Sequence, residues 1–297
     1  MRILFVHGIA QGGKNPYDLE HTWVETLKKG YEAAKLPFPD DLKVDFPFYG
    51  DALDKRVANS ALPLPAEMAA KGDSGNTAFE EFFTDSLKEM QVNAGIPQEE
   101  VALEAGPISA TKKGAQNWLL ALALARLLNR RATPVVSFSI ENLLRDVYLY
   151  TSDPNTSREI NGIVAQKLTD EPTVLVAHSL GTVVSYRVLQ EQSKRANIRR
   201  FITVGSPLGI KAITRKLGVI HYPKAELLWY NAFDKRDIVA LAPLSPPYFK
   251  TDPAIENYGG VQNQTDNRHG IIGYLNDVEV AKKIAEALTS KGKPIES

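Results

Sequence analysis

The sequence predicts an α/β protein built on a mostly parallel sheet with helices on both faces. Short apolar runs that suit buried strands alternate with segments whose apolar residues recur at helical spacing. One run, Thr173 to Ala177, is almost continuously apolar, which is typical of a parallel strand buried on both faces. No clear buried strand appears between about residues 50 and 150, which indicates a helical insertion.

The N-terminal elements are a strand, a loop, a helix and a second strand. Residues 3–6 are apolar and end in His7-Gly8, and a loop over residues 9–15 follows. The next apolar residues have helical spacing: Trp23, Val24, Leu27 and Tyr31. Residues 44–49 favour a second strand, although Pro47 cannot donate to a sheet ladder and weakens it.

Residues 51–150 are predicted to form a mainly helical cap inserted between two parts of the core, residues 1–50 and 151–297. Residues 61–76 are rich in Pro, Gly and Ala and are predicted to be irregular. Helical patterns occupy residues 79–90, residues 117–128 and the C-terminal end of residues 135–149.

Strands and helices alternate again after the insertion. Thr156 and Glu159 have the spacing of a capping box before an amphipathic helix. Further strands are expected at residues 173–177, 201–204, 226–232 and, less regularly, 257–261. Residues 182–190 predict a helix, and Asp277 is expected to cap a final one.

Composition excludes several classes of protein. The chain has no cysteine, so disulfide frameworks, thiolate catalysis and cysteine-ligated metals are excluded. Thirty-five basic residues balance 35 acidic ones, and such a chain offers no broad charged surface to nucleic acid. Its longest apolar stretch is far shorter than the roughly 20 residues that span a bilayer. We therefore expect a soluble, cytoplasmic protein without a transmembrane segment.

The segment Ala177-His178-Ser179-Leu180-Gly181 carries the strongest chemical signal. It lies between a buried strand and a helix and reads small-x-Ser-x-Gly, the pattern of a nucleophile elbow. The sharp turn exposes the serine hydroxyl and brings its flanking positions together, so both must be small. The backbone N–H of Leu180, at the helix start, is placed to stabilise an oxyanion. The alternative is an ordinary strand-to-helix turn with an incidental serine.

These features resemble the α/β-hydrolase superfamily, particularly its lipase- and esterase-like branches. The resemblance rests on the elbow, on His7-Gly8 after the first strand, and on the string from Phe201 to Gly209. It covers about two-thirds of the chain and excludes the helical insertion. It implies an α/β-hydrolase fold that is N-terminally shortened, because the family's usual first two strands have no counterpart here.

The resemblance also implies a base and an acid that follow the serine in the order Ser, acid, His. His269 lies before the final helix, where the family places its base, and the alternative is a surface loop histidine. The acid should follow the strand at residues 226–232, and Asp237 is favoured over Asp234 because Val239 completes a partial family pattern. His178 is expected to be a packing residue beside Ser179.

In the resembled lipases, the residue after His-Gly also donates its amide to the oxyanion. Ile9 is therefore expected opposite Leu180, with Ala10 as a nearby alternative and His7 as a structural residue. Gly12 and Gly13 either let the loop approach the substrate or merely make a turn. Their spacing with Lys14 does not fit a phosphate-binding loop, so nucleotide binding is not expected.

The expected function is cleavage of carboxylic esters through an acyl-enzyme, with no metal or other cofactor. A small-molecule or lipid-like ester is the expected partner, and the sequence specifies no oligomeric state. Residues 118–124 are apolar almost all round, so that helix either lines an acyl pocket as a lid or is simply buried. The alternatives are thioesterase, amidase or acyltransferase activity with the same triad, or a non-catalytic binding module.

Overall fold

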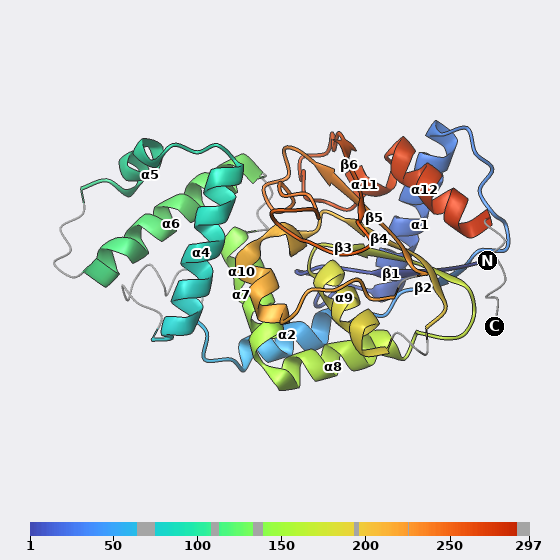
Figure 1. The fold of residues 1–297 in the computed structure, drawn as a ribbon, viewed down its shortest axis with the longest axis horizontal. Helices are drawn as coiled ribbons and strands as arrows, with labels where there is room; N and C mark the ends of the chain where they lie inside the picture. Colours follow the sequence, from blue (N-terminus) through green and yellow to red (C-terminus); the bar gives the residue numbers. More distant parts are fainter. Residues whose placement is uncertain (64–74, 108–112, 133–138, 193–195, 225, 290–297) are drawn as a thin grey trace.

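A computed structural model shows a six-stranded sheet in which every pair of neighbouring strands is parallel (Figure 1). The structure describes residues 1–63, 75–107, 113–132, 139–192, 196–224 and 226–289. The strand order is β2-β1-β3-β4-β5-β6. The strands are β1 (Arg2–Val6), β2 (Lys43–Asp45), β3 (Thr173–His178), β4 (Ile198–Val204), β5 (Leu228–Asp234) and β6 (Glu256–Val261).

Both faces of this sheet are covered, because side chains of the central strands alternate between two hydrophobic clusters. Ile3 and Phe5 of β1 face one cluster, whereas Leu4 and Val6 face the other. The first face packs against α1 (Pro16–Ala33), α11 (Ile272–Leu275) and α12 (Val278–Thr289). The second packs against α2 (Gly50–Ala58), α7 (Ile140–Ser152), α8 (Pro154–Ala165) and α9 (Leu180–Gln192). The predicted α/β class is therefore confirmed.

The second predicted strand is much shorter than expected. β2 ends at Asp45, so the prediction of a strand through residue 49 is wrong. The strand lies at the edge of the sheet and, among the described residues, pairs with β1 alone. Pro47 has no N–H to continue the ladder, and the chain enters α2 at Gly50.

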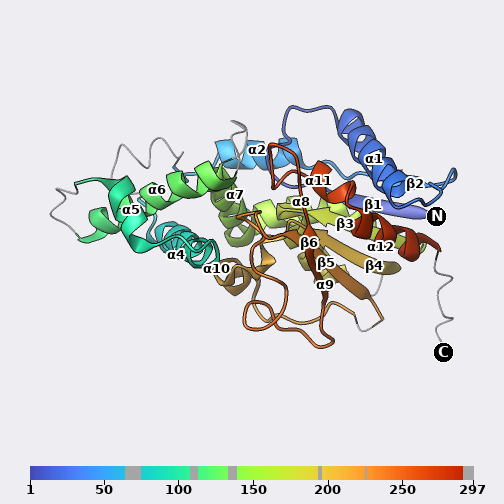
Figure 2. The same cartoon turned by 90° about the horizontal axis from the view of Figure 1, so that it is seen from above.

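The predicted helical insertion extends to one side of the sheet in both views (Figures 1 and 2). Its outer helices are α4 (Thr77–Asn93), α5 (Gln98–Ala105) and α6 (Lys113–Ala132). They join the hydrophobic cluster on the α9 side of the sheet. Residues 64–74 and 133–138 lie outside the described residues, so the predictions for them remain untested, as does the division into core and cap.

Charged contacts also connect α4 to the sheet-bearing part of the chain. The Glu89 carboxylate accepts the backbone N–H groups of Lys211 and Ala212 at 2.6 and 2.9 Å, at the start of α10 (Lys211–Thr214). A carboxylate at a helix N-terminus satisfies amides that have no acceptor within the helix. Arg215 pairs with Asp85 of α4 at 2.9 Å.

The cap predicted for the final helix is confirmed, whereas the capping box predicted at Thr156 is not. Asp277 accepts the amides of Glu279 and Val280 and caps α12 as expected. The capping box at Thr156 is wrong, because α8 begins earlier, at Pro154. Asp153 caps it instead, since its carboxylate accepts the Asn155 and Thr156 amides.

Two helical glycines should respond oppositely to alanine substitution. An added Cβ at Gly30 of α1 would lie 2.5 Å from the Leu275 carbonyl oxygen, whereas Gly162 of α8 has nothing within 4 Å. Gly30→Ala should lower the free energy of unfolding by about 1–3 kcal/mol through overpacking. Gly162→Ala should raise it by about 0.5–1 kcal/mol, because alanine is the better helix former. Urea titrations followed by circular dichroism measure both, and equal effects would contradict this packing.

Candidate active site

The turn around Ser179 has the geometry that the sequence predicts. β3 ends at His178, α9 begins at Leu180, and Ser179 between them has a φ of 55°. This left-handed conformation is uncommon for a residue with a side chain and marks local backbone strain. A Cβ at Gly181 would lie 2.4 Å from the carbonyl oxygens of both Val6 and His7. Only glycine therefore allows α9 to start this close to β1.

Three side chains from distant parts of the sequence meet at this turn. The Oγ of Ser179 lies 2.8 Å from Nε2 of His269, and Nδ1 of the same ring lies 2.8 Å from Oδ2 of Asp237. All three residues are at most 3% exposed. The structure thus brings together the serine, histidine and aspartate that the sequence singled out.

Asp234, the last residue of β5, and Asp237, in the loop that follows, have different partners. Asp237 bonds to His269, whereas Asp234 accepts the Arg236 guanidinium at 2.8 Å and the Asn263 amide at 2.7 Å. Burial alone would raise the pKa of the Asp234 carboxyl, but the hydrogen bonds from Arg236 and Asn263 lower it below its ordinary value. Asp234 therefore stabilises the loop, which leaves Asp237 beside the imidazole.

Tyr274 is a member of this cluster that the sequence analysis missed. Its hydroxyl donates to Oδ2 of Asp237 at 2.6 Å, the same oxygen that faces His269. Burial raises the pKa of Tyr274 well above its ordinary value, so the phenol remains a donor. The Val239 amide donates to the other carboxylate oxygen at 3.0 Å. The buried carboxylate is thus held by three donors from three directions.

Asn263 holds the loop that carries His269 and was also missed. It is 1% exposed, and its Nδ2 lies within 3.1 Å of the carbonyl oxygens of Asn267, Arg268 and Gly270. Its Oδ1 accepts the Thr265 amide at 3.0 Å. One amide side chain therefore organises the loop on both sides of the histidine. An isolated asparagine in a polar loop gives no sequence signal for this role.

His7 fixes the loop that faces Ser179, as predicted. Its Nδ1–H donates to the Gly8 carbonyl at 2.8 Å, and its Nε2 accepts the Tyr49 amide at 3.1 Å. The Tyr49 hydroxyl in turn donates to the His7 carbonyl. Gly8 then lies against the serine, since an added Cβ would be 2.7 Å from Cβ of Ser179.

Gly12 and Gly13 shape the loop after β1, and neither lines the cavity around Ser179. A Cβ at Gly12 would lie 2.0 Å from a carboxylate oxygen of Asp54, on α2. Gly13 has a φ of 72°, and its amide donates to Asp51 at 2.7 Å. These contacts favour the simpler interpretation, that the glycines make a turn which packs on α2.

His178 does more than pack beside Ser179. Its Nε2 lies 2.6 Å from the backbone carbonyl oxygen of His269, so this nitrogen carries a proton and donates. Burial, followed by the nearby His269, lowers the pKa of His178 well below its ordinary value. The ring is therefore neutral and holds the backbone of His269 in place.

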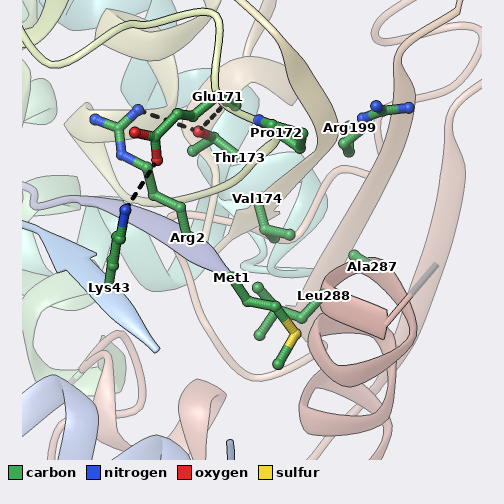
Figure 3. Close-up of a pocket in the computed structure, with 10 residues that line it drawn as sticks. All are labelled: Met1, Arg2, Lys43, Glu171, Pro172, Thr173, Val174, Arg199, Ala287 and Leu288. Atoms are coloured by element: carbon green, nitrogen blue, oxygen red, sulfur yellow. Dashed lines mark hydrogen bonds and ion pairs between the residues drawn. The ribbon is translucent and has the colours of Figure 1, made fainter. Parts of the chain in front are cut away.

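A cavity of about 450 Å³ contains Ser179 and His269 and is of a size that suits a small ligand. It lies at the carboxyl ends of the parallel strands, where open α/β sheets bind ligands. A second cavity, of about 270 Å³, lies at the opposite ends, around Arg2 and Thr173 (Figure 3). The Arg2 guanidinium there already pairs with Asp45 at 2.8 Å. The first cavity is therefore the candidate active site.

The apolar helix of the insertion is buried by its neighbours. Trp118 of α6 packs against Phe83 of α4 with ring centroids 5.4 Å apart, and α6 also packs along α5. Among the described residues, none between 51 and 150 lines the cavity around Ser179. Burial against α4 and α5 accounts for these side chains without a substrate.

No family model matches the chain, and the search of curated proteins finds no match. Within the ranges that the structure describes, no group of three or more His, Asp or Glu side chains could hold a metal ion. In the same ranges, every helix is too short or too polar to cross a membrane.

The buried His7 should make the folded state sensitive to acid. Burial lowers its pKa from 6.5 to about 4. Unfolded chains therefore bind a proton between these values while the folded protein does not, so stability present at neutral pH is lost as pH falls from 6.5 towards 4. Between pH 7 and 5 this one group should account for about 2 kcal/mol.

Urea unfolding of His7→Gln at both pH values tests this expectation. The variant should lose less stability than the wild type on acidification, because glutamine does not titrate. His21→Gln, on the exposed side of α1, should keep the wild-type dependence. An unchanged pH dependence in His7→Gln would show that the buried imidazole is not the responsible group.

Proposed function

We propose that this chain is a serine hydrolase that cleaves carboxylic esters through an acyl-enzyme. Ser179 acts as the nucleophile, His269 as the general base and Asp237 as the acid that orients the imidazole. One observation carries the proposal: Oγ of Ser179, both ring nitrogens of His269 and Oδ2 of Asp237 form a continuous chain of 2.8 Å contacts. A serine hydroxyl needs such a base to become a useful nucleophile.

The proton path follows from these contacts. Asp237 accepts the Nδ1–H of His269, which leaves the lone pair on Nε2 facing the serine hydroxyl. As Oγ attacks the ester carbonyl, Nε2 takes the hydroxyl proton, and the buried carboxylate stabilises the imidazolium that forms. The imidazolium then gives this proton to the leaving alcohol. Water, activated by the same base, releases the acid from Ser179.

The backbone around Ser179 supports an oxyanion hole made from Ile9 and Leu180. Leu180 is the first residue of α9, and the first amides of a helix lack intrahelical acceptors. Ile9 follows Gly8, where an added Cβ would lie 3.1 Å from Oγ of Ser179. No residue in the described ranges accepts a hydrogen bond from the Ile9 amide. Ala10 is the alternative, and its φ of 59° marks the sharp bend of the loop.

The architecture is compatible with the α/β-hydrolase fold. Its parallel sheet has helices on both faces, and Ser179 lies at the carboxyl end of a central strand. We propose a lipase- or esterase-like member that is shortened at its N-terminus. A thioester, an amide or acyl transfer would use the same intermediate, and matched substrates separate these reactions. The strained, fully connected cluster favours catalysis over a binding module that merely retains the fold.

Ser179→Ala should lower kcat by at least ~10⁴, because the nucleophile is lost. Hydrolysis of p-nitrophenyl esters measures the change, and a fluorophosphonate probe should label the wild type alone. Ser185→Ala is the matched control, since Ser185 is also buried on α9 and its hydroxyl bonds to nothing among the described residues. Full labelling of Ser179→Ala would refute the assignment of the nucleophile.

Substitutions of Asp237 and Asp234 should have different effects on kcat. Asp237→Asn should lower kcat by about 10⁴, because the amide no longer selects the reactive tautomer of His269. Asp234→Asn should act on stability instead, by about 1–3 kcal/mol, because it weakens charge-assisted bonds to Arg236 and Asn263. Kinetics and urea titrations on both variants distinguish them, and the reverse ranking in kcat would make Asp234 the acid.

A further inference from the structure

His178 has one ring nitrogen committed to the protein and one that faces the cavity around Ser179. Nε2 donates to the His269 carbonyl at 2.6 Å, so in the neutral ring Nδ1 carries a lone pair and can only accept. The side chain is 9% exposed and lines the cavity. Its lowered pKa keeps the ring neutral, which preserves the acceptor at Nδ1.

Nδ1 of His178 forms no hydrogen bond with any residue in the ranges that the structure describes. In the same ranges, the fully buried side-chain nitrogen and oxygen atoms without a hydrogen-bond partner are Tyr31 Oη, Arg145 Nη1, Ser185 Oγ, Arg187 Nη1 and Arg200 Nε. Nδ1 is not one of them, so it has access to the cavity. The residue is thus nine-tenths buried and presents a free acceptor next to the nucleophile.

Several other polar groups that line the cavity already have partners in the protein. The Gln11 amide donates to the Ile9 carbonyl at 2.8 Å, and the Thr22 hydroxyl donates to the Asp18 carbonyl at 2.7 Å. The Thr265 hydroxyl lies 2.6 Å from Oδ1 of Asn263. Much of the remaining wall is apolar: Ile9, Ala10, Leu19, Trp23, Ile271 and Ile272. An acceptor in such a wall selects for a donor on the ligand.

We propose that Nδ1 of His178 is a substrate-binding group, and that the substrate is an ester whose arm in this cavity carries a hydroxyl or N–H donor. This inference rests on the proposed function, because it places the ester carbonyl at Ser179. An arm without a donor would strip water from Nδ1 and leave it unpaired, which disfavours plain alkyl esters. The class of substrate is therefore a polar ester, such as a polyol or hydroxy-acid ester, rather than a simple alkyl one.

Matched substrates test the proposal on the wild-type enzyme. Propyl butyrate is the reference, 2,3-dihydroxypropyl butyrate adds hydroxyls to the alcohol arm, and propyl 3-hydroxybutyrate adds one to the acyl arm. We expect kcat/KM to rise about tenfold or more for one of the two hydroxylated esters, and the one that responds identifies the arm in the cavity. Equal kcat/KM for all three would overturn the proposal.

Two substitutions separate the functions of the two ring nitrogens. The side-chain nitrogen of His178→Gln can reach the position of Nε2 and keep the bond to the His269 carbonyl, but the acceptor at Nδ1 is lost. The oxygen of His178→Asn can occupy the position of Nδ1, while the bond to the carbonyl is lost. The preference for the hydroxylated ester should fall to about onefold in His178→Gln and survive in His178→Asn, since a ratio of substrates cancels a general loss of activity.

Fluorophosphonate labelling of Ser179 shows whether each variant retains a folded site. A preference that survives equally in both variants would assign it to another residue and refute the role of His178. If Ser179→Ala retained full ester hydrolysis, the proposed function itself would fail. That result is distinct from an active serine enzyme without any preference for hydroxylated esters, which would refute only the present inference. Should His178→Gln fail to fold, the wild-type substrate series still decides.

Discussion

The close approach of α9 to the end of β1 is the constraint on which the rest of the site depends. Gly181 has no room for a Cβ against the Val6 and His7 carbonyl oxygens, and Gly8 has none against Ser179. With both side chains absent, the chain can turn through the positive φ of Ser179 between β3 and α9. The strain of that turn is held by a buried parallel sheet on one side and a helix on the other. This contact fixes the serine hydroxyl and the nearby amides relative to each other.

Buried polar side chains hold His269 in place. Asp237 holds its Nδ1, His178 holds its backbone carbonyl, and Asn263 ties together the loop on both sides of it. Tyr274 in turn holds Asp237. Each of these groups would be costly to bury alone, so the network is stable only when its members are in place together. Preorganisation of this kind is what the proposed chemistry needs, because the base must already face the serine when substrate arrives.

The described residues of the helical insertion do not line the cavity around Ser179. Its apolar residues pack on one another and join the core cluster on the α9 side of the sheet, and Glu89 anchors α4 to the start of α10. The cavity around Ser179 is instead bounded by α1, the loop after β1 and the loop that carries His269. Residues that contact the proposed substrate are therefore expected in these elements and at His178, which also lines the cavity.

The sequence by itself determined the α/β class, most of the strands and helices, and the elbow at Ser179. These features depend on local patterns, namely apolar runs, helical periodicity and small residues at fixed offsets from one serine. The extent of β2 and the cap of α8 were wrong because sheet pairing and a competing aspartate, Asp153, decide them. The sequence favoured Asp237 over Asp234, and the tertiary structure shows its carboxylate beside His269. The structure alone revealed the roles of Tyr274 and Asn263, and a nitrogen of His178 that bonds to no described residue. Such contacts join residues tens of positions apart, and only the packing of the folded chain sets the distances between them.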